Sequence, residues 1–250
     1  MNRIKMAALL CAGAFALAGC NSDDGPTSST PAPVQAARNV IFFLGDGMGM
    51  TTLTAARIYA VGEDGALTID TLPESAFVKT YSNDAQVTDS APSMSAYMTG
   101  VKTNNEVISM SPDTKAIEPT AGLTGNCGAN NGKSVSTLLE IAKAKGMATG
   151  VVTTTRVTHA TPAATYAHVC HRDAENDIAA QLVPGGAGYN GALGDGVDVV
   201  LGGGTQFFVP KDGGGKRTDG RNLVNELKAK GYAFAQNRDG LGSTGDKATV

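Results

Sequence analysis

From residue 38 onward, short apolar runs alternate with segments of helical periodicity, and this alternation restricts the fold more than any other feature of the sequence. The runs that we expect to form strands cover residues 39–44, 76–81, 147–153 and 197–201. The segments that we expect to form helices cover residues 50–61, 90–97, 134–145 and 223–230. Alternating strands and helices predict an α/β sandwich with a largely parallel sheet.

The composition is that of a globular, glycine-rich and mildly acidic chain. With 42% hydrophobic and 17% charged residues among 250, the chain can bury a sizeable core. Its 32 glycines follow no Gly-X-Y period, which excludes collagen and implies many tight turns. The net charge of −3, without a dense basic run, argues against nucleic-acid binding.

The first 20 residues have the pattern of a bacterial lipoprotein signal peptide. Residues 1–5 carry two basic side chains, and residues 6–18 carry no charge. This apolar run is too short to span a membrane, which takes about 20 residues. It ends in a segment, residues 17–20 (LAGC), that resembles a lipobox, which implies cleavage after residue 19 and acylation of Cys20. The alternative is an ordinary signal peptide with a chance cysteine.

Acylation of Cys20 would tether the protein to a lipid bilayer, since several acyl chains anchor stably where one does not. Asn21, instead of an aspartate, follows the cysteine and favours the outer membrane of a bacterial cell envelope, facing the periplasm. The predicted organisation is therefore a signal peptide over residues 1–19, a lipidated cysteine and flexible linker over residues 20–37, and a folded domain over residues 38–250.

Asp46 lies in residues 45–49 (GDGMG), directly after the first predicted strand. In α/β proteins such positions collect functional residues. The segment is not a dinucleotide fingerprint, because Met50 stands where the third glycine would be. A carboxylate flanked by glycines suits a hard cation, while an aspartate that only caps the next helix is the alternative.

Ser90 lies in residues 88–91 (TDSA), where another predicted helix begins. A helix N-terminus offers free backbone N–H groups and the positive end of the helix dipole, which suit an anion. The hydroxyl is a poor nucleophile unless a base or a metal ion helps to remove its proton. Taken alone, this segment is also compatible with a serine that only caps the helix.

Cys127 and Cys170 are the two cysteines that remain after cleavage and acylation. Outside the cytoplasm such a pair is compatible with a disulfide, and two unpaired buried thiols are the alternative. Closing this loop would stabilise the fold by about 4 kcal/mol at most in the chain-entropy model.

Taken together, the motifs resemble the signatures of the alkaline phosphatase family. The matching segments occur in the family's order, and they are residues 45–49 (GDGMG), 88–91 (TDSA), 99–103 (TGVKT), 159–163 (HATPA), 165–172 (TYAHVCHR) and 201–204 (LGGG). The resemblance covers residues 39–227. It implies a three-layer α/β/α sandwich, incomplete at its C-terminus, and hydrolysis of phosphate monoesters to inorganic phosphate.

The resemblance also implies roles for individual residues. Ser90 matches the nucleophile that becomes a phosphoserine, and Asp46 matches the carboxylate that bridges a magnesium site and one of two zinc sites. Arg172 matches the arginine that grips the substrate phosphate, for which a planar bidentate fork is suited, and Asp89 would orient it. Thr161 matches a hydroxyl ligand of magnesium.

The resemblance also bears on the three histidines of the chain. His159 stands where some members carry aspartate and others histidine, close to the magnesium water shell, so it affects the metal preference of that site. His168 and His171 match no zinc ligand, and we expect them to be structural. The implied cofactors are two zinc ions and one magnesium ion, and whether the protein forms a homodimer stays open.

Several zinc and magnesium ligands of the family have no counterpart in these 250 residues. We therefore expect the chain to be the N-terminal portion of a longer enzyme. The alternative is a non-catalytic lipoprotein that binds phosphate or a metal. Within the same superfamily, a sulfatase or a phosphodiesterase is a weaker alternative, because Met94 replaces the arginine of the sulfatase signature.

Overall fold

The computed structural model describes residues 39–120, 123–242 and 248–249. The predicted signal peptide, the predicted acylation site at Cys20 and the predicted linker up to residue 37 lie outside the described residues. The chain divides into two compact units, Met1–Leu44 and Gly45–Val250. The elements that carry the candidate site all belong to the second unit.

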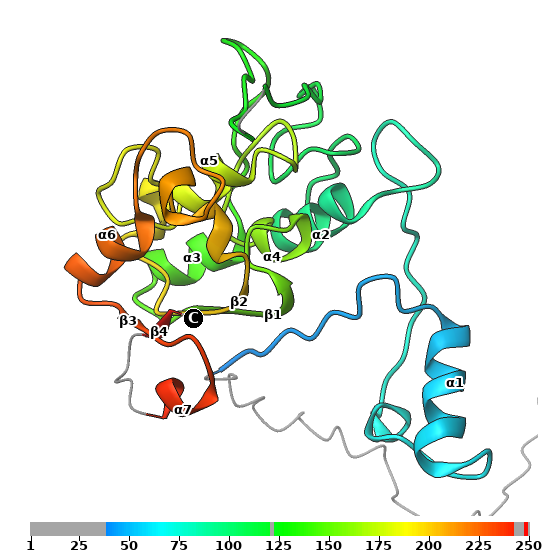
Figure 1. The fold of residues 1–250 in the computed structure, drawn as a ribbon. Helices are drawn as coiled ribbons and strands as arrows, with labels where there is room; N and C mark the ends of the chain where they lie inside the picture. Colours follow the sequence, from blue (N-terminus) through cyan, green and yellow to red (C-terminus); the bar gives the residue numbers. More distant parts are fainter. Residues whose placement is uncertain (1–38, 121–122, 243–247, 250) are drawn as a thin grey trace, which may run out of the picture. The chain divides into compact units, whose positions relative to one another are not determined.

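A parallel sheet organises the second unit (Figure 1). Its strands are β1 (Gly150–Arg156), β2 (Val199–Gly203), β3 (Ala233–Phe234) and β4 (Ala248–Thr249), in the spatial order β1-β2-β4-β3. Every pairing among these strands is parallel, and β1 pairs with β2 through Gly150 opposite Val199 and Val152 opposite Leu201. The expected α/β fold with a parallel sheet is confirmed, and the described residues supply part of it.

The structure also contains helices of one to three turns. The α-helices are α1 (Met50–Val61), α2 (Ser90–Thr99), α3 (Leu138–Ala144), α4 (Ala160–Ala163), α5 (Glu175–Ala180), α6 (Leu223–Ala229) and α7 (Arg238–Leu241). The 3₁₀ turns are η1 (Thr68–Thr71), η2 (Gly191–Leu193), η3 (Thr205–Phe207) and η4 (Lys211–Gly213). Within the described part of the chain, every helix is too short or too polar to cross a bilayer.

Caps determine where the helices begin and end. In α3, the Thr137 hydroxyl accepts from the backbone N–H of Glu140, and the Glu140 carboxylate accepts from the backbone N–H of Thr137. This reciprocal capping box starts the helix at residue 138, later than the predicted residue 134. Gly146, with a φ of 71°, follows the helix in the left-handed conformation that glycine adopts without strain.

The core lies between the sheet and the helices that Figure 1 shows above β1 and β2. Its largest fully buried side chains are Tyr166, Phe207, Ile108, Ile178, Leu193 and Leu223. The Tyr166 hydroxyl donates to the carbonyl of Val157 at 2.8 Å, which ties the chain after α4 to the end of β1. In β1, Val151 is buried while its neighbour Val152 is exposed, as expected for alternating side chains.

Two predicted strands are wrong. Residues 39–44 and 76–81 form no strand, and Phe43 and Phe77 are 87% and 95% exposed. An apolar β-branched run indicates a tendency toward burial, but a strand exists only where a neighbouring strand satisfies its backbone N–H and C=O groups. None of the strand pairings among the described residues includes either segment.

Cys127 and Cys170 form a disulfide, with their Cα atoms 5.6 Å apart. Next to it, Val169 and Ile108 exchange two backbone hydrogen bonds in an isolated antiparallel bridge. These two connections hold the segment that leads to Arg172 against the segment that follows α2.

Candidate active site

The N-terminus of α2 holds Ser90 and its neighbour Asp89. Asp89 is the N-cap, and its Oδ1 accepts from the backbone N–H of Ala91 at 2.6 Å. Its Oδ2 accepts from the backbone N–H of Glu106 at 2.6 Å. Ala91 and Met94 are buried on the core side of the helix. The cap and this packing fix the position of the Ser90 hydroxyl.

Arg172 joins these groups into one cluster. Its Nη1 donates to Asp89 Oδ1 at 3.0 Å and to Ser90 Oγ at 3.1 Å. Its backbone N–H donates to the carbonyl of Glu106 at 2.7 Å, and its side chain is 17% exposed. The structure therefore brings together the three residues that the sequence singled out as catalytic. A guanidinium beside a serine hydroxyl can hold an anion against that oxygen.

His159 lies on the other side of the same guanidinium. Arg172 Nη2 is 3.2 Å from His159 Nε2. Since arginine can only donate, Nε2 accepts and the proton of the neutral ring is on Nδ1. Burial, together with the positive charges of Arg172 and Arg156, lowers the pKa of His159 and keeps the ring neutral. Its Nδ1 is buried with no hydrogen-bond partner among the described residues.

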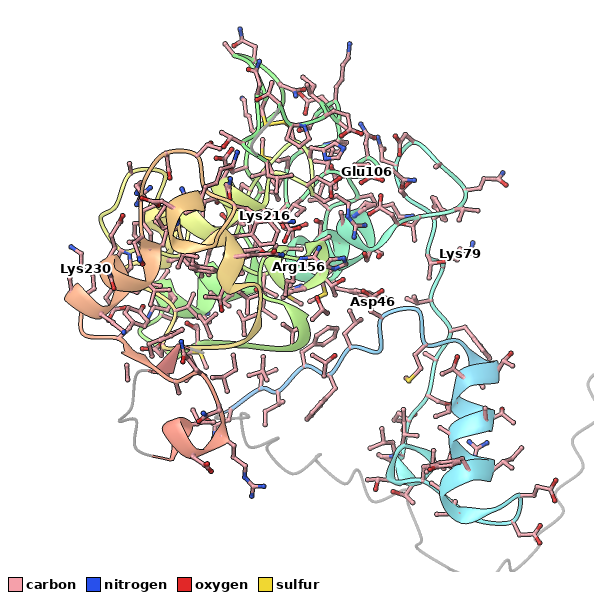
Figure 2. All side chains as sticks on the ribbon, in the orientation of Figure 1. Asp46, Lys79, Glu106, Arg156, Lys216 and Lys230 are labelled. Carbon is pink, nitrogen blue, oxygen red and sulfur yellow. A yellow bond between two sulfur atoms is a disulfide. The ribbon has the colours of Figure 1, made fainter. Side chains whose placement is uncertain are left out.

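Asp46 and Thr161 form the oxygen-rich part of the site. The Thr161 hydroxyl donates to Asp46 Oδ2 at 2.7 Å, across 115 positions of sequence. Thr161 lies in the first turn of α4, for which His159 is the N-cap, so α4 connects this pair to the Arg172 cluster. Figure 2 shows Asp46 projecting from its loop toward the part of the chain that carries Arg156.

Glu175 supports the connection from β1 to α4. Its carboxylate accepts from Arg156 Nε and Nη2, both at 2.9 Å, and from the Thr158 hydroxyl at 2.6 Å. These bonds hold both sides of the turn that presents His159 and Thr161. Sequence reasoning missed Glu175, because its partners are brought to it only by the tertiary fold.

Glu106 is a second residue that the sequence did not indicate. Its carboxylate Oε2 is 3.8 Å from Arg172 Nε, and its side chain is 41% exposed. Burial and the nearby charge of Asp89 raise the pKa of Glu106, and the charge of Arg172 opposes this shift. No sequence spacing relates Glu106 to Arg172.

The oxygens of Asp46 and Thr161 fit a divalent cation, and His159 lies beside them. The carboxylate and the hydroxyl are oxygen ligands of the kind that hard cations prefer, and their oxygens already lie within hydrogen-bond distance. The buried, unpartnered Nδ1 of His159, which carries the ring proton, is a donor that a bound water would satisfy.

Glu118, His171 and Asp173 form another group, with one ligand atom from each within 4.8 Å of the others. His171 Nδ1 accepts from the backbone N–H of Asp173 at 3.2 Å, so the proton of a neutral ring is on Nε2. That nitrogen faces Glu118 at 3.5 Å. The ring therefore offers no free lone pair, and we assign no metal to this group.

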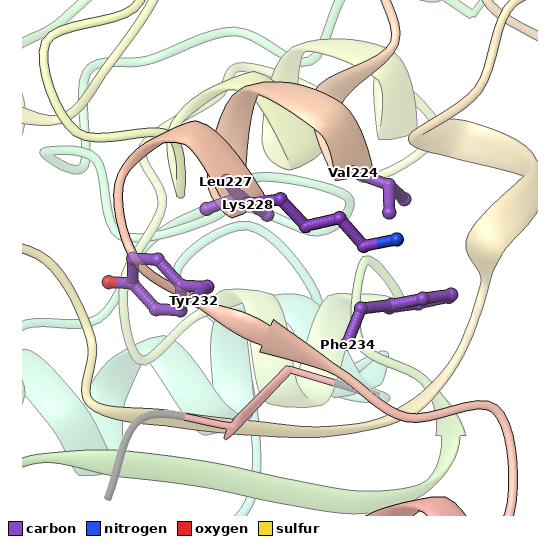
Figure 3. A pocket seen from close by; sticks show the side chains of 5 residues that line it. All are labelled: Val224, Leu227, Lys228, Tyr232 and Phe234. Atoms are coloured by element: carbon purple, nitrogen blue, oxygen red, sulfur yellow. The ribbon is translucent and has the colours of Figure 1, made fainter. Parts of the chain in front are cut away.

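A small pocket between α6 and β3 does not have the character of a reaction site (Figure 3). Its lining side chains are Val224, Leu227, Lys228, Tyr232 and Phe234. The Lys228 amine lies 5.1 Å from the centre of the Phe234 ring, and the Tyr232 hydroxyl donates to the carbonyl of Val197. No carboxylate, serine or histidine lines it.

Comparisons with known proteins show which family this chain resembles. Residues 37–250 match a family model described as alkaline phosphatase. The tissue-nonspecific alkaline phosphatase isozyme of Gallus gallus is 40% identical over 212 residues, which cover 75% of this chain and 39% of the relative.

Two solved structures extend the comparison. The cold-active alkaline phosphatase from a psychrophilic Shewanella species is 30% identical with a TM-score of 0.61, covering 80% of this chain and 42% of that one. A mutant of the alkaline phosphatase from the Antarctic bacterium TAB5, with a histidine replaced by glutamate and Mg bound in its M3 site, is 25% identical. Its TM-score is 0.61, and the match covers 81% of this chain and 49% of that one. The chain thus spans less than half the length of these relatives.

Proposed function

The chain belongs to the alkaline phosphatase family, and we propose that it takes part in the hydrolysis of phosphate monoesters, with Ser90 as the nucleophile. The observation that carries this proposal is the cluster at the N-terminus of α2. There, one guanidinium, that of Arg172, contacts both the Ser90 hydroxyl and the Asp89 carboxylate.

The chemistry needs few groups, because phosphoryl transfer depends mainly on positioning and charge neutralisation. Ser90 Oγ forms a bond to phosphorus while the bond from phosphorus to the ester oxygen breaks, which leaves a phosphoserine and an alcohol. Water then attacks the phosphoserine and releases inorganic phosphate. Arg172 binds the phosphate oxygens through its planar fork, and Asp89 holds that fork toward Ser90.

Metal ions would add positive charge to that of Arg172. We propose two zinc ions and one magnesium ion, which when bound would neutralise phosphate charge and favour the ionised forms of the Ser90 hydroxyl and of water. Asp46 and Ser90 would contribute to a zinc site, and Asp46 and Thr161 to the magnesium site. His159 would lie beside the magnesium site.

Replacing Ser90 with alanine tests the proposal. With the full-length, metal-loaded protein, we expect the wild type to acquire a covalent phosphate at Ser90 after rapid acid quenching of a reaction with a labelled phosphate monoester. Ser90→Ala is expected to acquire none and to lose at least 100-fold in kcat, since it lacks the nucleophile. Ser93→Ala, one turn further along α2, is the matched control.

A burst of product from Ser90→Ala would overturn the nucleophile assignment. Phosphate binding without turnover in the wild type would favour a non-catalytic role.

A further inference from the structure

Glu106 belongs to the candidate site, yet the proposed reaction gives it no task. Its backbone is fixed between the two parts of the cluster. Its N–H donates to Asp89 Oδ2 at 2.6 Å, and its carbonyl accepts from the backbone N–H of Arg172 at 2.7 Å. Two residues later, Ile108 pairs with Val169, which further restrains the segment. The position of the Glu106 side chain beside Arg172 is therefore set by the fold.

The backbone of Glu106 is strained. Its φ of 68° lies in the left-handed region, which glycine adopts freely and residues with a Cβ adopt at a cost. Asparagine and aspartate tolerate this region better than glutamate does. Strained residues concentrate at functional sites, so an observed outlier beside Arg172 supports a functional hypothesis. The chain carries a charged side chain where glycine would fit with less strain.

The carboxylate of Glu106 approaches the Nε of the Arg172 guanidinium, whose two terminal nitrogens contact other members of the cluster. Glu106 Oε2 is 3.8 Å from Arg172 Nε. Nη1 contacts Asp89 and Ser90, and Nη2 contacts His159. In Figure 2 the label of Glu106 marks its place on the segment that follows α2. A phosphate held by Arg172 would thus share this cation with the Glu106 carboxylate.

We propose that Glu106 weakens the binding of phosphate at Arg172 and so promotes the release of inorganic phosphate. This inference rests on the proposed function, in which Arg172 holds the phosphate of both substrate and product. Two anions that share one cation repel each other, so the Glu106 charge raises the free energy of bound phosphate. Weaker product binding speeds release, a step that limits turnover in many enzymes.

Two substitutions separate the charge of Glu106 from its backbone strain. Glu106→Gln keeps the size of the side chain and the strained φ but removes the charge, whereas Glu106→Gly removes both. Glu74→Gln removes an equal charge from an exposed position on the loop after η1, and is the control. With the full-length, metal-loaded protein, we would measure the inhibition constant of inorganic phosphate, and KM and kcat for a chromogenic phosphate monoester, at low and at high ionic strength.

Both Glu106 variants are expected to have an inhibition constant for phosphate about threefold to tenfold lower than the wild type, with a lower KM and no gain in kcat. The difference should shrink at high salt, because the carboxylate is partly exposed and ions screen it. Glu74→Gln should match the wild type. An inhibition constant that is unchanged or raised in both Glu106 variants would overturn the proposal.

Equilibrium binding tests this inference independently of turnover. The Ser90→Ala protein cannot form a phosphoserine, so calorimetry with inorganic phosphate reports binding alone. Tighter binding by the double variant Ser90→Ala/Glu106→Gln than by Ser90→Ala supports the role of Glu106 even if the wild type hydrolyses no monoester. Equal affinities, or no binding to either protein, overturn it even if turnover is normal.

Discussion

At the scale of single residues, His159 is the position where one substitution should most change metal binding. It is a neutral imidazole at the N-cap of α4, two positions before Thr161. A neutral ring adds no negative charge beside the Asp46 carboxylate, so we propose that His159 limits the affinity of this site for a divalent cation.

We predict that His159→Asp raises the affinity for Mg²⁺ about tenfold, the lower end of the usual effect of groups that support a metal site. The added carboxylate would supply charge that a hard cation prefers. Titration calorimetry of the metal-stripped, full-length protein with Mg²⁺ measures the change. His159→Asn is the control, because asparagine has the shape of aspartate without its charge. Equal Mg²⁺ affinities of His159→Asp and His159→Asn would contradict the prediction.

At the scale of elements, the start of α3 depends on a buried pair of side chains, His168 and Glu140. His168 Nδ1 is 2.7 Å from the carbonyl of Ser109, and its Nε2 is 2.6 Å from Glu140 Oε1. Burial opposes the ionisation of Glu140, but hydrogen bonds from His168, Asn190 and Thr137 outweigh it, and the pKa of Glu140 lies below its usual value.

A lowered pKa of Glu140 has a defined consequence for stability against pH. Ionised Glu140 stabilises the fold above the pKa of glutamate in an unfolded chain, about 4.3, and this contribution is lost as pH falls through the lowered folded value. Glu140→Gln is expected to lower the free energy of unfolding by about 3 kcal/mol at pH 7, because it removes a buried carboxylate that accepts hydrogen bonds from His168, Asn190 and Thr137. The loss should shrink as the pH falls below about 4.

Urea denaturation of the wild type and Glu140→Gln between pH 3 and pH 7 measures this difference. Glu226 lies on α6 and forms a partly exposed ion pair with Arg221. Glu226→Gln is the control, and it should lower the free energy of unfolding by about 1 kcal/mol or less. A difference between wild type and Glu140→Gln that stays constant with pH would show that Glu140 acts only through its shape.

The helices were more predictable from the sequence than the strands, for a physical reason. The pattern over residues 50–61 gives the bounds of α1, and α6 ends one residue before the prediction, where Gly231 follows. Helical hydrogen bonds are local, so caps and periodicity suffice to place them. Residues 39–44 failed as a strand because pairing depends on distant segments, which no local pattern specifies.

Some residues of the candidate site were predictable from the sequence, and others were found only in the structure. Ser90 was identified at the start of a predicted helix, which the structure contains as α2. Asp46 was identified at the end of a predicted strand over residues 39–44, which the structure does not form. Glu106 and Glu175 act on Arg172 and Arg156 through contacts that only the folded chain creates. Charged residues that adjust a site from its edge leave no motif, so the structure was required to find them.

At the scale of the whole molecule, a lipid anchor is the proposed feature that would most affect where the proposed activity occurs. We propose that the mature chain begins at Cys20, is acylated there, and lies in the bacterial cell envelope with residues 21–37 as a linker. Since this linker separates the anchor from the candidate site, anchoring and catalysis should be separable by mutation.

Cys20→Ser is expected to remove the protein from the membrane fraction and to abolish incorporation of a labelled fatty acid, while kcat per molecule in detergent stays at the wild-type value. Cys11→Ser offers a matched control, because that cysteine lies in the segment that cleavage removes and its loss should change neither property. The intact mass of the wild type should equal that of a chain starting at residue 20 plus acyl groups. A Cys20→Ser protein that still incorporates the fatty acid would place the lipid elsewhere, and a wild-type mass without acyl groups would reduce residues 1–19 to an ordinary signal peptide.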